Sequence, residues 1–327
     1  MEQNDNHTLP INVLFIVFNR PEKTQRVFEA IRRARVGSLF IAADGHRPER
    51  IGEAETCAEV KRIVTRVDWP CKVKTLFRNK NLGCKMAVSS AIDWFFENVN
   101  EGIILEDDCL PTNSFFEFCQ KLLEKYRDNE QVMQINGNYY LDDLKHFNES
   151  YYFSKLNGCW GWATWKRAWK HFDKSMSGYN EFKNHNGILK YFKDKEISDW
   201  MTSYLDEADT PKCKIWSTQW SYAIIIKNAL CITPTKNLVK NIGFDKKGTT
   251  GLHKSYLKYT EFDIENIGEI IHPVNITHDL ESDSLMFKSI IKITDPRLIK
   301  ENFRIKLSRV KNKIFQRLKT SIKKIIH

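Results

Sequence analysis

The sequence has no apolar run that approaches the ~20 residues needed to span a bilayer. Its first residues include Glu2 and Asp5 and lack the basic start of a signal peptide. The eight cysteines are scattered without a CxxC pair, which suggests neither a zinc site nor a disulfide framework. We therefore expect a cytoplasmic protein in which most cysteines are small buried apolar side chains.

Phosphate-binding loops are also missing. Neither GxGxxG nor GxxxxGKS/T follows the first apolar run, which argues against a dinucleotide site and against a P-loop. The negative charge of any bound phosphate must then be neutralised by a metal ion and by Arg or Lys side chains.

Excess positive charge is scarce outside the C-terminal tail. The net charge is +10, but residues 300–327 hold ten Lys or Arg against one acid, Glu301. The rest of the chain is nearly neutral at +1. This distribution gives no indication of a positively charged surface on residues 1–299 that would bind the phosphates of a nucleic acid.

The tail itself has apolar side chains three or four residues apart, with basic residues between them. The apolar positions are Phe303, Leu307, Val310, Ile314, Leu318, Ile322 and Ile325. This pattern favours an amphipathic helix on an anionic membrane surface, where each cation near the lipid adds roughly 1 kcal/mol. A coiled-coil or partner helix is the competing interpretation.

The first hundred residues alternate between strand and helix patterns. Runs at 11–18, 38–43, 72–77 and 103–105 predict strands, and the segments between them predict helices. Such alternation predicts an α/β fold with a mostly parallel sheet flanked by helices. A helix over residues 114–126 follows, and the alternation then weakens.

Polar residues follow directly after these predicted strands. Arg20, Asp44 and Arg78 each come just beyond a strand, and the fourth strand ends in the acids of residues 106–108. In a parallel sheet such strand ends share one edge, where ligands bind. Three adjacent carboxylates repel one another, so a cation or polar ligand is expected to offset the repulsion. A charged turn is the plain alternative, but the shared edge favours a binding site.

Aromatic residues gather in the middle of the chain. Trp165 and Trp169 are four residues apart, which favours core packing on a helix. Trp160 and Trp162 flank a glycine and either pack in the core or form a platform for the apolar face of a sugar. The segment 241–251 is rich in glycine, lysine and hydroxyls, and is either a surface loop or a lid over an anionic ligand.

Six stretches carry a resemblance to a known family. They are VLFIVFNRP, FIAADGHR, NLGCKMAVSSAIDWFF, GIILEDDCLP, CWGWATWKRAW and NLVKNIGF. Together they resemble bacterial glycosyltransferases of the GT-A type, which have a Rossmann-like fold and are family 2-like nucleotide-diphospho-sugar transferases. They are more distantly similar to N-acetylglucosaminyltransferase I. The resemblance covers roughly residues 10–255.

What the resemblance implies is transfer of a hexosyl or N-acetylhexosaminyl group from a nucleotide-sugar donor, expected to be a UDP-sugar. The acceptor would be a saccharide or a lipid-linked acceptor in surface polysaccharide or lipopolysaccharide assembly. It also implies a divalent metal, Mn²⁺ or Mg²⁺. Residues 1–298 would then form the transferase domain, with a donor half at about 10–140 and an acceptor half at about 141–298. Residues 299–327 would hold the protein at the inner face of the membrane.

The resemblance also assigns roles to single residues. Asp108 matches the acid that coordinates the cation on the donor's phosphates, and is expected to be catalytic in that sense. Glu106 and Asp107 match positions that touch the ribose and the donor sugar. Asp44 matches the acid that hydrogen-bonds the uracil ring, and Arg20 matches a basic residue near the diphosphate.

Further residues are candidates for binding the donor or the acceptor. Arg78 and Lys85 are candidates for charge-assisted contacts with the donor, and Thr249 and Thr250 fall where the family has a loop that orders over the diphosphate. On the acceptor side the candidates are Trp160, Trp162 and Ser217.

One position departs from the family pattern. The relatives usually carry an acid just after the first tryptophan of the 216–220 segment, as the base that deprotonates the acceptor hydroxyl. This chain has Ser217 there, and neither Ser217 nor Thr218 is a base at neutral pH without help. Three interpretations stay open: another acid, first of all Asp199, is the catalytic base; the reaction retains the anomeric configuration and needs no base; or the protein is weakly active or inactive. The loop also lacks the family's histidine near Thr250, although His253 is close.

Two other function classes compete with glycosyl transfer. A nucleotidyltransferase that makes nucleotide sugars generally carries a glycine-rich, basic loop after the first strand, where this chain has Asn19-Arg20-Pro21. A non-catalytic carbohydrate- or membrane-binding protein would account for Ser217 and the amphipathic tail.

Overall fold

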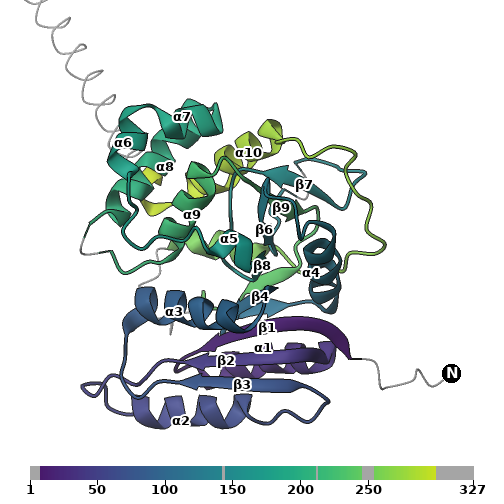
Figure 1. Cartoon of the computed structure of the whole chain (residues 1–327), viewed down its shortest axis with the longest axis vertical. Helices are drawn as coiled ribbons and strands as arrows, with labels where there is room; N and C mark the ends of the chain where they lie inside the picture. Colours follow the sequence, from purple (N-terminus) through teal and green to yellow (C-terminus); the bar gives the residue numbers. More distant parts are fainter. Residues whose placement is uncertain (1–7, 142–143, 211–212, 245–253, 300–327) are drawn as a thin grey trace, which may run out of the picture.

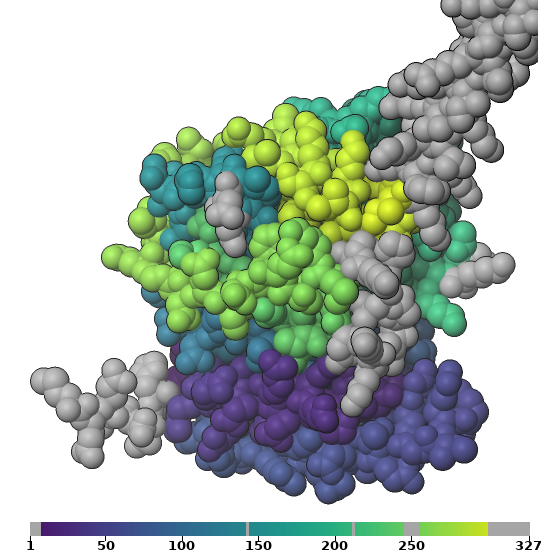
Figure 2. Space-filling model, turned by 180° about the vertical axis from the view of Figure 1, so that it is seen from behind, coloured from purple at the N-terminus to yellow at the C-terminus, as the bar shows by residue number. Residues whose placement is uncertain are grey.

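The computed structural model describes residues 8–141, 144–210, 213–244 and 254–299. An eight-stranded sheet runs through the described chain, and helices cover both of its faces (Figure 1). Seen from behind, the N-terminal elements form one end of the molecule in purple and the C-terminal ones the other end in green to yellow (Figure 2). Within the described ranges, no helix is long and apolar enough to cross a membrane.

The sheet has the strand order β3-β2-β1-β4-β8-β6-β9-β7. Six strands point the same way, while β8 and β7 run antiparallel to their neighbours. This confirms the predicted α/β fold with a mostly parallel sheet. The strands are β1 Leu9–Val17, β2 Val36–Ala43, β3 Lys72–Phe77, β4 Glu101–Glu106, β6 Val132–Asn136, β7 Tyr151–Ser154, β8 Trp162–Trp165 and β9 Leu230–Pro234. A separate two-stranded antiparallel sheet pairs β5, Cys109–Pro111, with β10, Val239–Asn241.

The helices divide between the two faces of the sheet. Apolar residues of α1, α2 and α4 pack in one buried cluster with one side of the strands, and those of α3, α5 and α9 pack in a second cluster with the other side. The helices α6, α7 and α8 form a third cluster with α9 and with the segments near the C-terminal end of the described chain. The helices are α1 Pro21–Ala34, α2 Glu53–Val64, α3 Gly83–Asn98, α4 Asn113–Lys125, α5 Lys166–Trp169, α6 Tyr179–Asn184, α7 Gly187–Phe192, α8 Lys195–Ala208, α9 Ser217–Ile226, α10 Leu280–Met286 and α11 Lys292–Thr294, with a 3₁₀ helix at Lys254–Glu261 and a π-helical turn at Phe287–Ile291.

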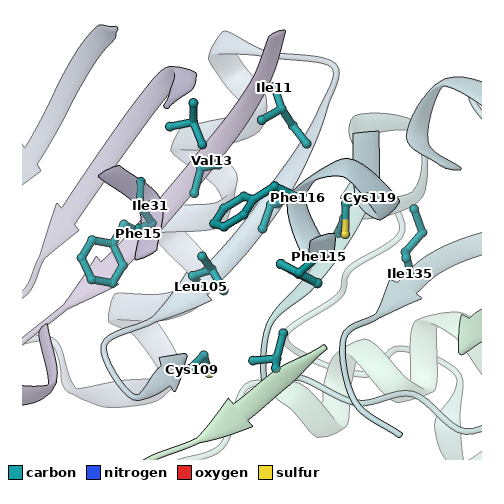
Figure 3. Packing of buried hydrophobic residues seen from close by; sticks show 14 of the residues in the cluster. Ile11, Val13, Phe15, Ile31, Leu105, Cys109, Phe115, Phe116, Cys119 and Ile135 are labelled. Carbon is teal, nitrogen blue, oxygen red and sulfur yellow. The ribbon is translucent and has the colours of Figure 1, made fainter. Parts of the chain in front are cut away.

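The unbroken apolar run of β1 reflects burial on both faces of the sheet. Phe15 belongs to the cluster under α1 and α4, whereas Leu14 and Ile16 belong to the cluster under α3. Successive side chains of a strand point to opposite faces, so a strand covered on both sides must be apolar at every position. Figure 3 shows the first cluster, in which Phe15 and Leu105 of neighbouring strands lie near Phe116 of α4.

Tryptophans fill the cluster on the α3 side. Trp165 and Trp169 are 1% and 4% exposed, which confirms that both are core residues. They do not share a helix, because Trp165 ends β8 and only Trp169 lies in α5. Trp162 is 1% exposed and stacks on Trp216 with ring centroids 5.7 Å apart. The predicted sugar platform is therefore wrong for Trp162, since its ring is packed inside the protein.

The cysteines are more evenly divided than expected. All eight are free, and four are buried: Cys57, Cys109, Cys119 and Cys231. Cys84 is exposed and the other three are half-buried, so burial accounts for half of them rather than for most.

Candidate active site

The acid triplet, residues 106–108, begins at the last residue of β4. The parallel pairing of β1 with β4 brings the link between β1 and α1 beside it. Arg20, the last residue of that link, donates from Nη1 to Asp107 Oδ1 at 3.2 Å and to Asp108 Oδ2 at 2.6 Å. The backbone N–H of Phe18 donates to Asp107 Oδ2 at 3.2 Å. The structure thus brings the predicted Arg20 and the predicted acids into direct contact.

Burial and mutual repulsion shape the charge of the acid triplet. Burial raises the pKa of Glu106 above the usual carboxyl range, and the nearby carboxylates of Asp108 and Asp107 raise it further. Burial also raises the pKa of Asp107, although the Arg20 guanidinium opposes this rise. Buried carboxyls with raised pKa values are stabilised in their charged form by added positive charge, which suits a site for a cation or a ligand with donor groups.

Asp44 follows β2 and holds the start of α3. Its Oδ1 accepts from the N–H groups of Gly45 and Leu82 at 3.0 and 3.1 Å, and its Oδ2 accepts from those of Leu82 and Gly83 at 3.0 and 3.1 Å. Burial raises the pKa of Asp44 even though these backbone donors lower it. The carboxylate therefore fixes the α3 N-terminus at this edge of the sheet, and its contact with a uracil ring stays a prediction.

Of the two further donor candidates on this side, Arg78 directly follows β3 and Lys85 lies in the first turn of α3. Arg78 Nη2 donates to Ser90 Oγ at 2.8 Å. The Gln219 side-chain amide is oriented so that its nitrogen donates to backbone carbonyls and its oxygen accepts a hydrogen bond. In this orientation Lys85 Nζ donates to the Gln219 oxygen at 2.9 Å. Arg78 thus lies on the Asp44 side of the helix start, while Lys85 reaches toward α9.

A segment distant in sequence packs against Asp108. The N–H of Ile242 donates to the backbone carbonyl of Asp108 at 2.8 Å, and Lys23 Nζ donates to the Gly243 carbonyl at 3.5 Å. A Cβ on Gly243 would lie 2.2 Å from Asp108 Oδ2. Only glycine lets the backbone approach this carboxylate so closely. The sequence placed Gly243 in a glycine-rich stretch but gave no sign of its partner.

Glu53 is a second residue that sequence reasoning missed. Its carboxylate accepts from Asn19 Nδ2 at 2.9 Å, from the Arg47 backbone N–H at 2.8 Å and from the Arg47 guanidinium. The hydrogen bonds from the Arg47 side chain lower the pKa of Glu53 to about 2, although burial opposes them. Glu53 thereby ties the link that carries Arg20 to the segment after β2.

Ser217 and Asp199, the two positions considered for the acceptor base, lie on different helices. Ser217 is the first residue of α9, and its carbonyl accepts from Ser221 Oγ at 3.2 Å. Asp199 lies on α8 with a side chain that is 66% exposed and ion-paired with Lys195 at 2.7 Å. Asp199 is therefore exposed to solvent, and its described side-chain contact is with Lys195 and not with the acid triplet.

Trp160 keeps a position at the surface of the aromatic core. It is half-buried, and its ring meets Phe244 and Tyr259 edge-on at 5.0 and 4.9 Å between centroids. Phe244 directly follows Gly243, so this aromatic group begins next to the residue that packs on Asp108. Acceptor binding by Trp160 stays a prediction.

The acid triplet offers part of a cation site. Across the described residues, no group of three or more His, Cys, Asp and Glu side chains is arranged to hold a metal ion. Asp107 and Asp108 nevertheless present hard carboxylate oxygens on one side of Arg20. Mg²⁺ in nucleotide enzymes is commonly held by one or two carboxylates together with substrate phosphates. The donor set therefore fits a cation that arrives with a phosphate ligand.

Several predicted features lie outside the described residues. They are Thr249, Thr250 and His253 of the 245–253 segment and the amphipathic tail at 300–327.

Comparisons with known proteins give no family. No family description and no curated protein matches the chain. A solved UDP-glucose pyrophosphorylase complexed with UDP-glucose is 11% identical, over 49% of this chain and 78% of that one, with a TM-score of 0.31. HddC from Yersinia pseudotuberculosis is 11% identical over 48% and 78%, with a TM-score of 0.30. UTP-bound UGPase from Acinetobacter baumannii is 8% identical over 77% and 92%, with a TM-score of 0.35. Likenesses this low carry no argument about function.

Proposed function

We propose that the chain is a metal-dependent enzyme that transfers a sugar from a nucleotide-diphosphate donor, a UDP-sugar, to an acceptor hydroxyl. The observation that carries the proposal is the meeting of Arg20 with Asp107 and Asp108 at the carboxyl edge of the sheet. This edge is where ligands bind in open α/β sheets. A basic residue beside clustered acids suits a diphosphate that arrives with a cation.

The chemistry of the leaving group gives each residue a role. As the glycosidic bond breaks, negative charge grows on the nucleotide diphosphate. Arg20 supplies a guanidinium fork for its phosphate oxygens, and Lys23, near the Gly243 carbonyl, adds a second positive charge. Asp108, with Asp107, would hold the divalent cation, which supplies Lewis-acid stabilisation of the leaving diphosphate when bound.

The acceptor base has no structural support in the residues first considered. Ser217 is a poor base at neutral pH, and Asp199 is exposed and paired with Lys195. The structure therefore favours the other two interpretations over Asp199 as the base: a retaining reaction, which needs no enzymatic base, or a weakly active protein. The product anomer separates these interpretations, and NMR of the product measures it.

A nucleotidyltransferase is the second candidate. This candidate would also place a nucleotide at the same edge of the sheet, beside Arg20 and the acids. Against it, the link between β1 and α1 is Phe18-Asn19-Arg20, which contains no glycine. Such a link offers no run of flexible backbone N–H groups to cradle a triphosphate.

Anion-exchange chromatography of the products formed by the full chain with Mn²⁺ distinguishes the two reactions. With a panel of UDP-sugars and GDP-sugars, the glycosyltransferase proposal predicts slow hydrolysis of the donor to nucleoside diphosphate and free sugar. The diphosphate should be released faster when an acceptor is present, and Asp108→Ala should abolish both reactions. With UTP and a sugar 1-phosphate, the second candidate predicts pyrophosphate instead. Pyrophosphate release without diphosphate release would overturn the proposal.

The acceptor is proposed to be a saccharide or lipid-linked saccharide at the inner face of the cytoplasmic membrane. The support is the sequence pattern of residues 300–327, ten cations on a helix pattern with one apolar face. A lipid-linked acceptor would be met at the surface where such a helix binds.

A further inference from the structure

Arg20 contacts the same carboxylates that the proposed function gives to a cation. One guanidinium nitrogen, Nη1, lies 3.2 Å from Asp107 Oδ1 and 2.6 Å from Asp108 Oδ2. Of the remaining oxygens, Asp107 Oδ2 accepts from the Phe18 N–H, and Asp108 Oδ1 lies 3.7 Å from the Cys109 thiol. Arg20 Nη1 thus lies between one oxygen of Asp107 and one oxygen of Asp108, where a cation could also contact both acids.

We propose that Arg20 and the divalent cation are alternative partners of Asp107 and Asp108, and that the nucleotide diphosphate selects the cation by drawing Arg20 onto its phosphates. The inference rests on the proposed function. A guanidinium and a divalent cation that contact the same carboxylate oxygens repel each other, and this repulsion weakens both contacts. The cation alone therefore competes with Arg20 for one oxygen of each acid.

The ligand supply points the same way. Within the described ranges, no set of three acidic, His or Cys side chains is arranged around one point. A cation on Asp107 and Asp108 therefore needs oxygens from elsewhere, and the diphosphate has them. The same diphosphate offers the planar Arg20 guanidinium two phosphate oxygens for a bidentate contact in place of the acids. The Arg20 side chain is 22% exposed, so it reaches a ligand at the surface without crossing the core.

This exchange makes cation and nucleotide strongly coupled ligands. Each must raise the affinity of the other by the same factor, because coupling between two sites is reciprocal. Arg20 is then a positioning residue that keeps the acids occupied until a donor arrives with its cation.

Electron paramagnetic resonance of free Mn²⁺ tests this without an activity assay. The full chain is titrated with MnCl₂ alone and with UDP, and GDP serves as a second nucleotide. We expect UDP to tighten Mn²⁺ binding by about 10-fold or more in the native protein. In Arg20→Gln, Mn²⁺ alone should bind about 10-fold more tightly, since a charge-assisted contact no longer competes, and the effect of UDP should shrink accordingly.

Matched variants separate contact from charge. Arg32→Gln removes the same charge without touching the acids, because Arg32 bonds Glu29 and Asp68 instead, and should keep the native coupling. Asp108→Asn should lose Mn²⁺ binding with and without UDP. Arg20→Lys retains the charge but loses the bidentate fork, and should fall between the native protein and Arg20→Gln.

The outcomes are distinct. If Mn²⁺ and UDP bind together to the native protein, but Arg20→Gln binds Mn²⁺ alone no more tightly and keeps the native effect of UDP, the inference is overturned while the proposed function stands; Arg20→Met, which also removes the charge, gives the same comparison if Arg20→Gln fails to fold. If Arg20→Gln and Arg32→Gln change Mn²⁺ binding alike, the change comes from the net charge of the protein, and the proposed exchange is refuted. If neither nucleotide nor Mn²⁺ binds the native protein, the proposed function fails as well.

Discussion

Replacing Gly243 with alanine should disable the acid triplet while leaving the fold intact. An added Cβ would lie 2.2 Å from Asp108 Oδ2 and 2.9 Å from Asn241 Oδ1. Gly243 is not among the glycines with positive φ, so alanine suits its backbone and the conflict is with its neighbours alone. Ordinary contact begins near 3.4 Å, so the Asp108 carboxylate or the segment must shift by roughly 1 Å.

The size of this shift sets the expected effect. A misplacement of ~1 Å in a catalytic group costs on the order of 100-fold in rate. The 2.6 Å contact of Asp108 with Arg20 would break at the same time. We expect Gly243→Ala to lower kcat/KM for hydrolysis of the preferred nucleotide sugar by about 100-fold, with a loss of stability below about 1 kcal/mol.

The control is Gly268→Ala. A Cβ at Gly268 meets no heavy atom within 4 Å, so this variant should keep both the activity and the melting temperature. Native kcat/KM in Gly243→Ala would refute the reasoning, because the close approach of this backbone to Asp108 would then have no part in the site. A large drop in melting temperature would instead assign Gly243 to folding.

Three further predictions follow from the described contacts and the sequence. Because the pKa values of Glu106 and Asp107 lie above the ordinary carboxyl range, protons compete with the cation, and Mn²⁺–UDP binding measured by calorimetry should weaken with falling pH well above about pH 4. In Glu53→Gln the charge-assisted bonds to Arg47 are lost, and the free energy of unfolding measured by chemical denaturation at pH 7 should fall by about 1.5 kcal/mol. Because the pKa of Glu53 is lowered to about 2 in the folded protein, this difference from the native protein should fade as the pH falls from about 4.5 toward 2. Deletion of residues 300–327 should release the protein from anionic vesicles in a sedimentation assay and leave activity on a soluble acceptor; unchanged vesicle binding would favour a partner helix.

The parallel half of the fold could be predicted because its signals are local. Strands buried on both faces read as continuous apolar runs, as in β1, and Pro21 marks the start of α1. The antiparallel insertion of β8 between β4 and β6 could not be predicted in this way. Four-residue spacing suggested a helix for Trp165, but pairing with distant strands decided its conformation.

The same limit applies to the site. Arg20 and the acids could be predicted to meet, since parallel strand ends share an edge. Gly243 and Glu53 could not, because their partners are fixed by tertiary packing and no periodicity encodes it. Trp162 was misjudged for the same reason: whether a tryptophan beside a glycine faces solvent depends on which sheet it joins.

The central claim is that Asp108, at the carboxyl edge of the sheet, binds a nucleotide diphosphate through a divalent cation. Isothermal titration of UDP into the full chain with saturating Mn²⁺ tests it most directly, with Asp108→Asn as the comparison. The account predicts saturable binding to the native protein that is lost in the variant and when the metal is removed with chelator. Absence of binding to the native protein by both UDP and GDP, or equal affinity in Asp108→Asn, would contradict it.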